Sequence, residues 1–261
     1  MSHNHHENTH AENAGLRSVL TALDVLDLFA HEAELGVSDI ARYLGIAKST
    51  AYRVVSTLCS RGLVEQAAES RRYRLGLHLY ELGQISQDRL QLRHVALPLL
   101  KRLQVATGHT VHLSVVDGTD VIFIERLQGI QMIPVIGDRR RRQPMHTTSA
   151  GKAIAAFNSD AAAARARAGF PRRTDTTITT GAEWTRQLAE VRDRHFAVCN
   201  GENYPGVASI AVPFRDISGD AVAAISLVGT SAQLISRLDH HVRLLQGTAA
   251  RISRGLPQVK A

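Results

Sequence analysis

Hydrogen-bond donors cluster between residues 48 and 53, where they could recognise nucleic acid. If residues 48–58 form a helix, its apolar side chains turn inward and five polar or cationic residues near its start face outward: Lys48, Ser49, Thr50, Tyr52 and Arg53. Hydroxyl and cationic groups at the start of a helix can contact phosphates and base edges in a major groove. Taken alone, such a helix is better explained as a solvated polar face.

A basic hairpin follows this helix. Residues 62–66 and 71–75 have the composition of strands, and a polar turn at residues 67–70 separates them. The tip and the second strand carry arginines that could contact the DNA backbone or the minor groove: Arg71, Arg72 and Arg74. The hairpin alone would also fit a structural role. A tight turn, a basic helix and a basic hairpin in succession favour a winged helix-turn-helix.

The preceding segments would position the basic helix. Apolar residues recur at intervals of three and four and predict a first helix whose apolar stripe faces a core: Leu16, Val19, Leu20, Leu23 and Leu26. Ser38 is expected to cap a short second helix that ends at Gly45. Ala41 and Gly45 are small enough to let the second and third helices cross closely.

The second half of the chain has a mixed pattern. A helical register from Leu77 predicts a linker helix, and the pattern changes to mixed helices and strands after Pro98. Strands are expected at 111–116, 121–125, 132–136, 196–198, 207–214 and 221–228, and helices near 151–157, 182–194 and 233–254. The expected α+β chain has a disordered tail (1–14), a winged helix-turn-helix domain (15–76), a linker helix (77–94) and a domain with an antiparallel sheet (95–261).

Composition narrows the class of protein. The net charge of +7 suggests a polyanionic partner, but residues 15–94 hold ten Lys/Arg against nine Asp/Glu, whereas 95–261 hold twenty-one against thirteen. Cys59 and Cys199 are too few and too distant for a disulfide framework or a Cys-rich zinc site, which fits a reducing compartment. No charge-free apolar stretch of about 18 residues occurs, so we expect a cytoplasmic protein without a membrane partner.

Enzymatic motifs match poorly. The stretch 149–152 resembles a phosphate-binding loop, but the first glycine is replaced by His146 and the residue after Lys152 is Ala153. His109 and His112 are three apart on an expected strand and would point to opposite faces. No Gly-x-Ser-x-Gly elbow is present. We therefore expect no catalytic residue, metal or cofactor, and keep a hydrolase or metal-dependent enzyme as the alternative.

Two groups of motifs make the chain similar to the isocitrate lyase regulator (IclR) family of bacterial transcription regulators, over roughly residues 16–252. The motifs are SVLTALDVL (18–26), SDIA (38–41), KSTAYR (48–53), YRLG (73–76) and PMHTTSAGKA (144–153). The resemblance implies a GAF-like effector-binding domain over 95–261. It also implies a homodimer or tetramer on a near-palindromic DNA operator, acting as a repressor of a catabolic operon.

The resemblance also implies where the effector binds. It assigns the pocket to a loop before a helix and to the facing strands, with these residues: His146, Ser149, Ala150, Gly151, Cys199, Glu202, Ser209 and Ser226. The hydroxyl and N–H groups at the helix start would suit a small organic acid, such as an aromatic carboxylate. His146 fits a structural role equally well. The chain departs from the commoner family pattern at residues 200–202 and at Ser209, which leaves the ligand's identity open.

Two further charged segments are better explained without a functional role. The run of arginines at 139–142 could attract an anionic effector or a second DNA contact, but a solvated charged loop is the better explanation. The His-rich tail, which includes His3, His5, His6 and His10, could bind metal, but a tail without a rigid ligand cage is assigned no function.

Overall fold

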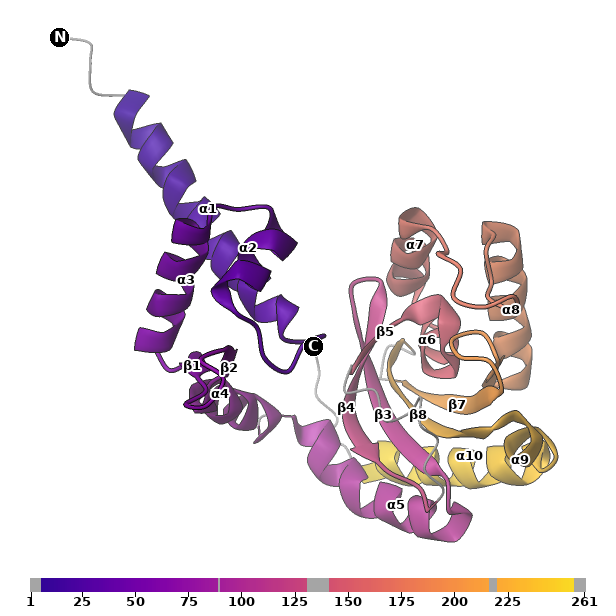
Figure 1. Ribbon diagram of the computed structural model, residues 1–261. Coiled ribbons are helices and arrows are strands. Elements are labelled where there is room, and N and C mark those ends of the chain that lie inside the picture. The colour runs from indigo at the N-terminus through magenta and orange to yellow at the C-terminus, as the bar shows by residue number, and fades with distance from the viewer. Residues whose placement is uncertain (1–5, 89, 131–140, 216–219, 256–261) are drawn as a thin grey trace. The chain divides into compact units, whose positions relative to one another are not determined.

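The structure is a computed structural model that describes residues 6–88, 90–130, 141–215 and 220–255 (Figure 1). The chain divides into two compact units, Met1–Arg89 and Leu90–Ala261. No helix among the described residues is long and apolar enough to cross a membrane.

The N-terminal unit contains four helices and a two-stranded antiparallel sheet: α1 (His6–Leu28), α2 (Val37–Leu44), α3 (Lys48–Ser60), β1 (Val64–Gln66), β2 (Tyr73–Leu75) and α4 (Leu77–Asp88). Its core joins α1, α2, α3 and the hairpin through Val25, Ile40, Val55 and Tyr73. Leu35 pairs with Tyr73 by two backbone hydrogen bonds, which tie the segment before α2 to the hairpin. These elements form the expected winged helix-turn-helix.

The turn between α2 and α3 has the expected left-handed residue, because Gly45 adopts φ +64° at the end of α2. The start of α2 differs from the prediction. Gly36, not Ser38, is the N-cap, and its N–H donates to Asp39 Oδ2 at 3.2 Å. The hydrogen bond from Gly36 therefore moves the helix start upstream and leaves Ser38 inside the first turn.

Two expected boundaries are also wrong. Helix α1 begins at His6, within the segment expected to be a disordered tail; residues 6–14 contain neither Gly nor Pro and several good helix formers. The linker helix ends at Asp88 rather than residue 94, and α5 begins at Gln91. Pro98 lies inside α5, where packing of Leu100 and Leu103 on the sheet offsets the hydrogen bond that proline removes.

The C-terminal unit is built on one antiparallel sheet in the order β5-β4-β3-β8-β7-β6. The strands are β3 (Thr110–Asp117), β4 (Asp120–Leu127), β5 (Arg142–Pro144), β6 (Ala197–Asn200), β7 (Val207–Arg215) and β8 (Ala221–Thr230). Five expected strands are thus confirmed, and β5 was not predicted. The expected strand at 132–136 lies outside the described residues. The α+β class is confirmed.

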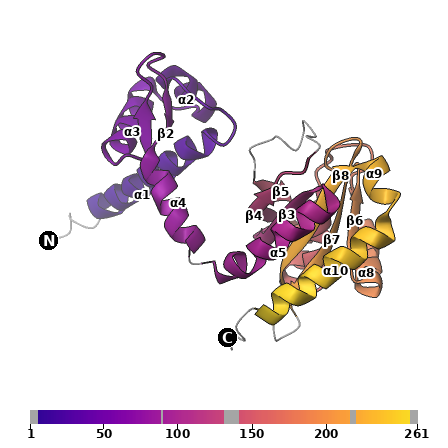
Figure 2. The same ribbon diagram turned by 90° about the horizontal axis from the view of Figure 1, so that it is seen from below.

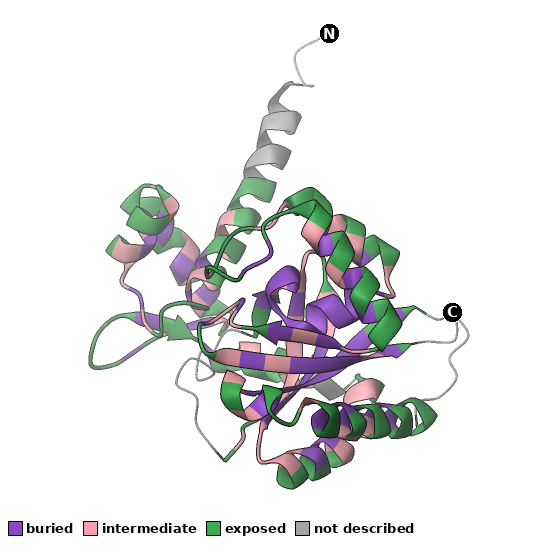
Figure 3. Ribbon diagram, turned by 90° about the vertical axis from the view of Figure 1, so that its right-hand side faces the viewer, coloured by how far each residue is buried: buried purple, intermediate pink, exposed green. Residues whose placement is uncertain are grey.

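Helices cover both faces of this sheet (Figures 1 and 2). One face packs against α5 (Gln91–Thr107), α9 (Ser231–Ile235) and α10 (Leu238–Gly255). The other carries a 3-10 helix, η2 (Met145–Thr147), and the helices α6 (Ser149–Ala155), α7 (Ser159–Ala168) and α8 (Gly181–Arg194). The central strands are therefore buried along most of their length (Figure 3).

Alternation along the strands assigns side chains to the two layers. Val111 and Leu113 face α5 and α10, whereas His112 and Ser114 face the α6 layer. Beneath α6 the sheet presents small residues, which let the helix approach closely: Ala197, Ala211 and Ala224. Polar side chains replace these alanines further along the same face, and that change positions the cavity described below.

Candidate functional site

The donor-rich start of α3 is exposed. All five residues expected to face outward do so, and Tyr52 is 57% exposed. Ala51, Val55 and Leu58 are buried and fix the helix to the core. The N-cap, Ala47, has no side-chain acceptor, so it satisfies none of the N–H groups of the first turn. This end of α3 therefore offers hydroxyl, cationic and backbone donors to an anionic partner.

The wing arginines differ in their surroundings. Arg72 donates to Asp39 Oδ2 at 2.7 Å, and the pKa of Asp39 is lowered mainly by the Gly36 N–H and further by Arg72. Arg74 pairs with Glu65 across the hairpin at 2.6 Å. Arg71 lies at the exposed turn with φ +54° and makes no ion pair within the described part of the chain. Arg71 is thus the wing arginine best placed to reach outward.

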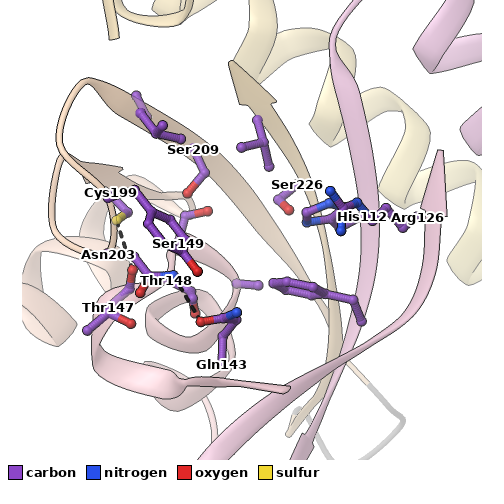
Figure 4. A pocket seen from close by; sticks show the side chains of 16 residues that line it. His112, Arg126, Gln143, Thr147, Thr148, Ser149, Cys199, Asn203, Ser209 and Ser226 are labelled. Atoms are coloured by element: carbon purple, nitrogen blue, oxygen red, sulfur yellow. Dashed lines mark hydrogen bonds between the residues drawn. The ribbon is translucent and has the colours of Figure 1, made fainter. Parts of the chain in front are cut away.

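The C-terminal unit contains a cavity between the sheet and the loop that leads into α6. Its floor follows the register of the sheet. His112 is paired with Arg126 on β4 and with Ser226 on β8, so all three side chains share one face. Ser209 on β7 is likewise opposite Cys199 on β6 and contributes to the same floor. Figure 4 shows Ser149 reaching this space from the opposite wall.

A β-bulge brings one more side chain to the floor. The register of β3 and β4 shifts between Leu113 and Ser114, so that Ile124 is an extra residue in β4. Phe123 and Arg126 are three residues apart and would face opposite sides of a regular strand. With the bulge, both line the cavity, and the Phe123 ring stacks on His112 with centroids 4.3 Å apart.

The loop wall is polar and buried. Thr148 caps α6 by accepting the Gly151 N–H at 3.0 Å, which fixes Ser149 at the start of the helix. Ser149 is 1% exposed and its Oγ has no hydrogen-bond partner among the described residues. Cys199 Sγ donates to the Thr147 carbonyl at 3.1 Å, and burial raises the pKa of this thiol to about 12. The thiol is therefore protonated and acts as a small wall residue.

Five of the residues expected at the effector site line the cavity: Ser149, Ala150, Cys199, Ser209 and Ser226. Three do not. Gly151 packs against the Met145 backbone, and His146 is buried with its Nε2 3.1 Å from the Pro171 carbonyl. Burial lowers the pKa of His146 to about 4, which corresponds to the structural role considered for it.

Glu202, the third residue outside the cavity, is part of a buried ion pair. Its Oε1 accepts from Lys152 Nζ at 2.6 Å, and Lys152 is 1% exposed. Glu202 is therefore used to hold α6 against the turn after β6. Its charge suggested a pocket rim in the sequence, but the buried lysine that neutralises it lies fifty residues away.

Several residues that line the cavity were not expected from the sequence, above all His112, Phe123 and Arg126. The alternation of polar Thr110, His112 and Ser114 with apolar neighbours was the available signal for a polar row on one face. Of the arginine run, Arg141 donates to the Phe123 carbonyl at 2.9 Å and Arg142 pairs with Asp117. These two residues are therefore bound within the unit; Arg139 and Arg140 lie outside the described residues.

Known proteins resemble both units. Residues 18–68 match the IclR helix-turn-helix domain, and residues 84–254 match the bacterial transcriptional regulator IclR C-terminal domain. The chain is 33% identical over 227 residues to the HTH-type transcriptional regulator XynR of Escherichia coli K12. This alignment covers 86% of this chain and 88% of that protein. It is 34% identical over 223 residues to the glycerol operon regulatory protein of Streptomyces coelicolor, covering 84% and 87% respectively.

A solved structure agrees. An IclR homologue from Microbacterium hydrocarbonoxydans, complexed with 4-hydroxybenzoate, superimposes with a TM-score of 0.78 at 28% identity and covers 92% of this chain and 99% of that chain. The matched family and relatives are transcriptional regulators, so the alternative of a hydrolase or metal-dependent enzyme is not supported. With a winged helix-turn-helix and an effector-type sheet domain matched in order, the chain belongs to the IclR family of bacterial transcriptional regulators.

Proposed function

We propose that this regulator is a cytoplasmic repressor of a catabolic operon, and that a small organic acid in the cavity of its C-terminal unit controls its affinity for the operator. The observation that carries the proposal is that cavity, whose wall holds the buried, unpartnered hydroxyl of Ser149. A buried hydroxyl without a partner is costly, and a ligand that pairs with it removes that cost. The exposed start of α3 supplies the DNA-binding half of the function.

In the proposed complex, α3 enters the major groove. Lys48 and Arg53 contact base edges or phosphates there, helped by Ser49, Thr50 and Tyr52. Arg71 contacts the adjacent backbone. Arg72 and Arg74 exchange their exposed carboxylate partners for phosphate, which is feasible because surface ion pairs contribute little to stability.

The regulator acts as a homodimer, which can pair into a tetramer. Four apolar residues of α1 that were expected to face a core are instead each 52–64% exposed: Leu16, Val19, Leu20 and Leu23. An exposed apolar stripe of this kind marks an interaction surface, and a second copy of the chain is the partner that a two-fold operator requires. Light scattering of the full chain tests this; a monomer that binds a single half-site with full affinity would exclude the dimer.

The acidic nature of the effector rests on the donors of the loop wall and on charge. The Ser149 side chain lines the cavity together with apolar side chains such as those of Phe123 and Val228. Residues 95–261 carry twenty-one Lys/Arg against thirteen Asp/Glu, which favours anionic ligands over neutral ones. The related structure from Microbacterium hydrocarbonoxydans is complexed with 4-hydroxybenzoate, a small aromatic acid.

DNA binding is tested by gel shift on DNA from beside the regulator's own gene. Lys48→Ala or Arg53→Ala should weaken operator binding by about 1–3 kcal/mol each, because each removes a base or phosphate contact. Arg61→Ala is the matched control, since Arg61 is an exposed arginine at the opposite end of α3. Unchanged affinity in both test variants would disprove the role given to α3.

Effector control is tested in the same assay with benzoate-like and aliphatic acids added. An acid that occupies the cavity should shift the operator affinity of the wild type and should act more weakly on Ser149→Ala. Lys48→Ala should keep its affinity for the acid in calorimetry. If no acid changes the gel shift, or if Ser149→Ala responds as the wild type does, the proposed effector site is wrong.

A further inference from the structure

His112 has an unsatisfied polar atom in the cavity wall. It lies in the middle of β3 and is 4% exposed, and its Nε2 has no hydrogen-bond partner among the described residues. The side chain is held in place by the Phe123 ring, on which it stacks, and by register neighbours on both sides, Arg126 and Ser226.

Protonation of the His112 ring does not remove the cost of the unsatisfied Nε2 atom, because the ring stays neutral. Burial, with a smaller contribution from Arg126 and Arg141, lowers the pKa of His112 to about 3. The ring is therefore a neutral imidazole with one N–H group and one lone pair. A hydroxyl group is the best partner for it, because a hydroxyl can accept from the N–H or donate to the lone pair, whichever of these Nε2 presents.

A second unsatisfied group lies on the other wall. Ser149 Oγ is buried, and Figure 4 shows Ser149 and His112 on opposite sides of the cavity, one from the start of α6 and the other from the sheet. Phe123, Val207 and Val228 add apolar side chains to the lining of the same cavity. This arrangement fits a flat ring with a polar substituent at each end.

We propose that His112 is a specificity-determining residue that selects aromatic acids carrying a ring hydroxyl on the side opposite the carboxylate. The inference rests on the proposed acid effector: the carboxylate lies at the Ser149 end and the hydroxyl hydrogen-bonds to His112 Nε2. A ring without that hydroxyl fills the same space but leaves Nε2 buried and unpaired. Discrimination therefore comes from the penalty on the wrong ligand as much as from the bond to the right one.

The test is calorimetry on the full-length chain with benzoate, 4-methylbenzoate and 4-hydroxybenzoate. The methyl compound is the matched ligand, because it has nearly the shape of the hydroxyl compound without its hydrogen bond. The wild type should bind 4-hydroxybenzoate at least about tenfold more tightly than 4-methylbenzoate. His112→Phe should abolish this preference while still binding the methyl compound, which also shows that the variant is folded.

Two further variants sharpen the test. His112→Gln can still hydrogen-bond and should restore part of the preference. Ser114→Ala removes another buried polar atom without a partner among the described residues, on the same strand and face, but Ser114 does not line the cavity. This variant should therefore prefer 4-hydroxybenzoate over 4-methylbenzoate as strongly as the wild type does. This inference alone would be overturned if the wild type bound 4-hydroxybenzoate no more tightly than 4-methylbenzoate. It would also be overturned if His112→Phe kept the wild-type preference for 4-hydroxybenzoate. Failure of every acid to bind the wild type would overturn the proposed effector class as well.

Discussion

Lys152→Met should destabilise the C-terminal unit more than any change in a surface ion pair. Lys152 lies inside α6, and its Nζ donates to Glu202 Oε1 at 2.6 Å and to the Val198 carbonyl at 3.2 Å. The lysine and the glutamate are 1% and 9% exposed in their side chains. Methionine has a similar length and no charge, so the substitution removes the cation without leaving a large void.

The cost arises from the carboxylate that remains. The Glu202 side chain is 9% exposed, and its backbone is held in this buried position by the Thr177 hydroxyl, which donates to the Glu202 carbonyl at 2.7 Å. Removing one partner of a buried ion pair generally costs about 3–5 kcal/mol, and we expect that range at pH 7. Burial already raises the pKa of Glu202, opposed by Lys152; without the lysine the pKa must rise further. When folding raises the pKa of a carboxyl group, the free energy of unfolding of the protein falls as the pH rises. The variant should therefore recover stability as the pH is lowered from 7 toward 5.

Urea unfolding measured by tryptophan fluorescence provides the assay. Trp184 is the only tryptophan of the chain and is 2% exposed in the layer that contains α6, so its signal reports on the C-terminal unit. Adding Glu202→Gln to Lys152→Met should restore most of the lost free energy of unfolding, because no buried charge then remains.

The control is a surface pair in the same unit. Arg194 and Glu190 are each about half exposed, so Arg194→Met should cost less than about 1 kcal/mol. The reasoning is refuted if Lys152→Met costs no more than this control, or if the double variant is as unstable as the single one.

Two other expectations follow from the same unit. Gly151→Ala would place a methyl group 2.6 Å from Met145 Cα, so it should reduce the free energy of unfolding by about 1–3 kcal/mol in urea; an unchanged value would show that α6 can shift freely. His112 and His146 have pKa values lowered to about 3 and about 4, so the unfolded chain binds more protons, and stability should fall between pH 6.5 and 4. The slope should approach about 1.4 kcal/mol per pH unit for each histidine, and His146→Asn should flatten it; a pH-independent stability over this range would contradict the buried neutral rings.

Local sequence signals predicted most of the secondary structure. The strands β3, β4, β7 and β8 contain strand-like apolar runs, and Gly45 marks the end of α2, so both types of element were recognised. Helix α7 was missed because its run of alanine and arginine has no apolar stripe; Asn158, which accepts the Ala161 N–H, is its only clear start signal. The break between α4 and α5 depends on which unit each helix packs against, and local periodicity does not contain that information.

Part of the candidate site was expected from the family resemblance. The resemblance assigned Ser149, Ala150, Ser209 and Ser226 to the pocket, and all four line the cavity. His112 becomes a site residue only through its pairing with neighbouring strands. Phe123 joins it through a one-residue bulge that alternation cannot reveal.

The position of the cavity follows from how side-chain size varies along one face of the sheet. Where Ala197, Ala211 and Ala224 cover the strands, α6 packs closely and leaves no space. Where Ser209 and Ser226 follow on the same strands, the facing wall includes the loop residues Thr147 and Thr148 and the first two residues of α6, Ser149 and Ala150. A ligand in this gap must therefore contact the sheet and the start of α6 together. Such a ligand changes the regulator's affinity for DNA only if it binds more tightly at one spacing of these two walls than at another. The change in DNA affinity is limited by that difference in ligand-binding free energy.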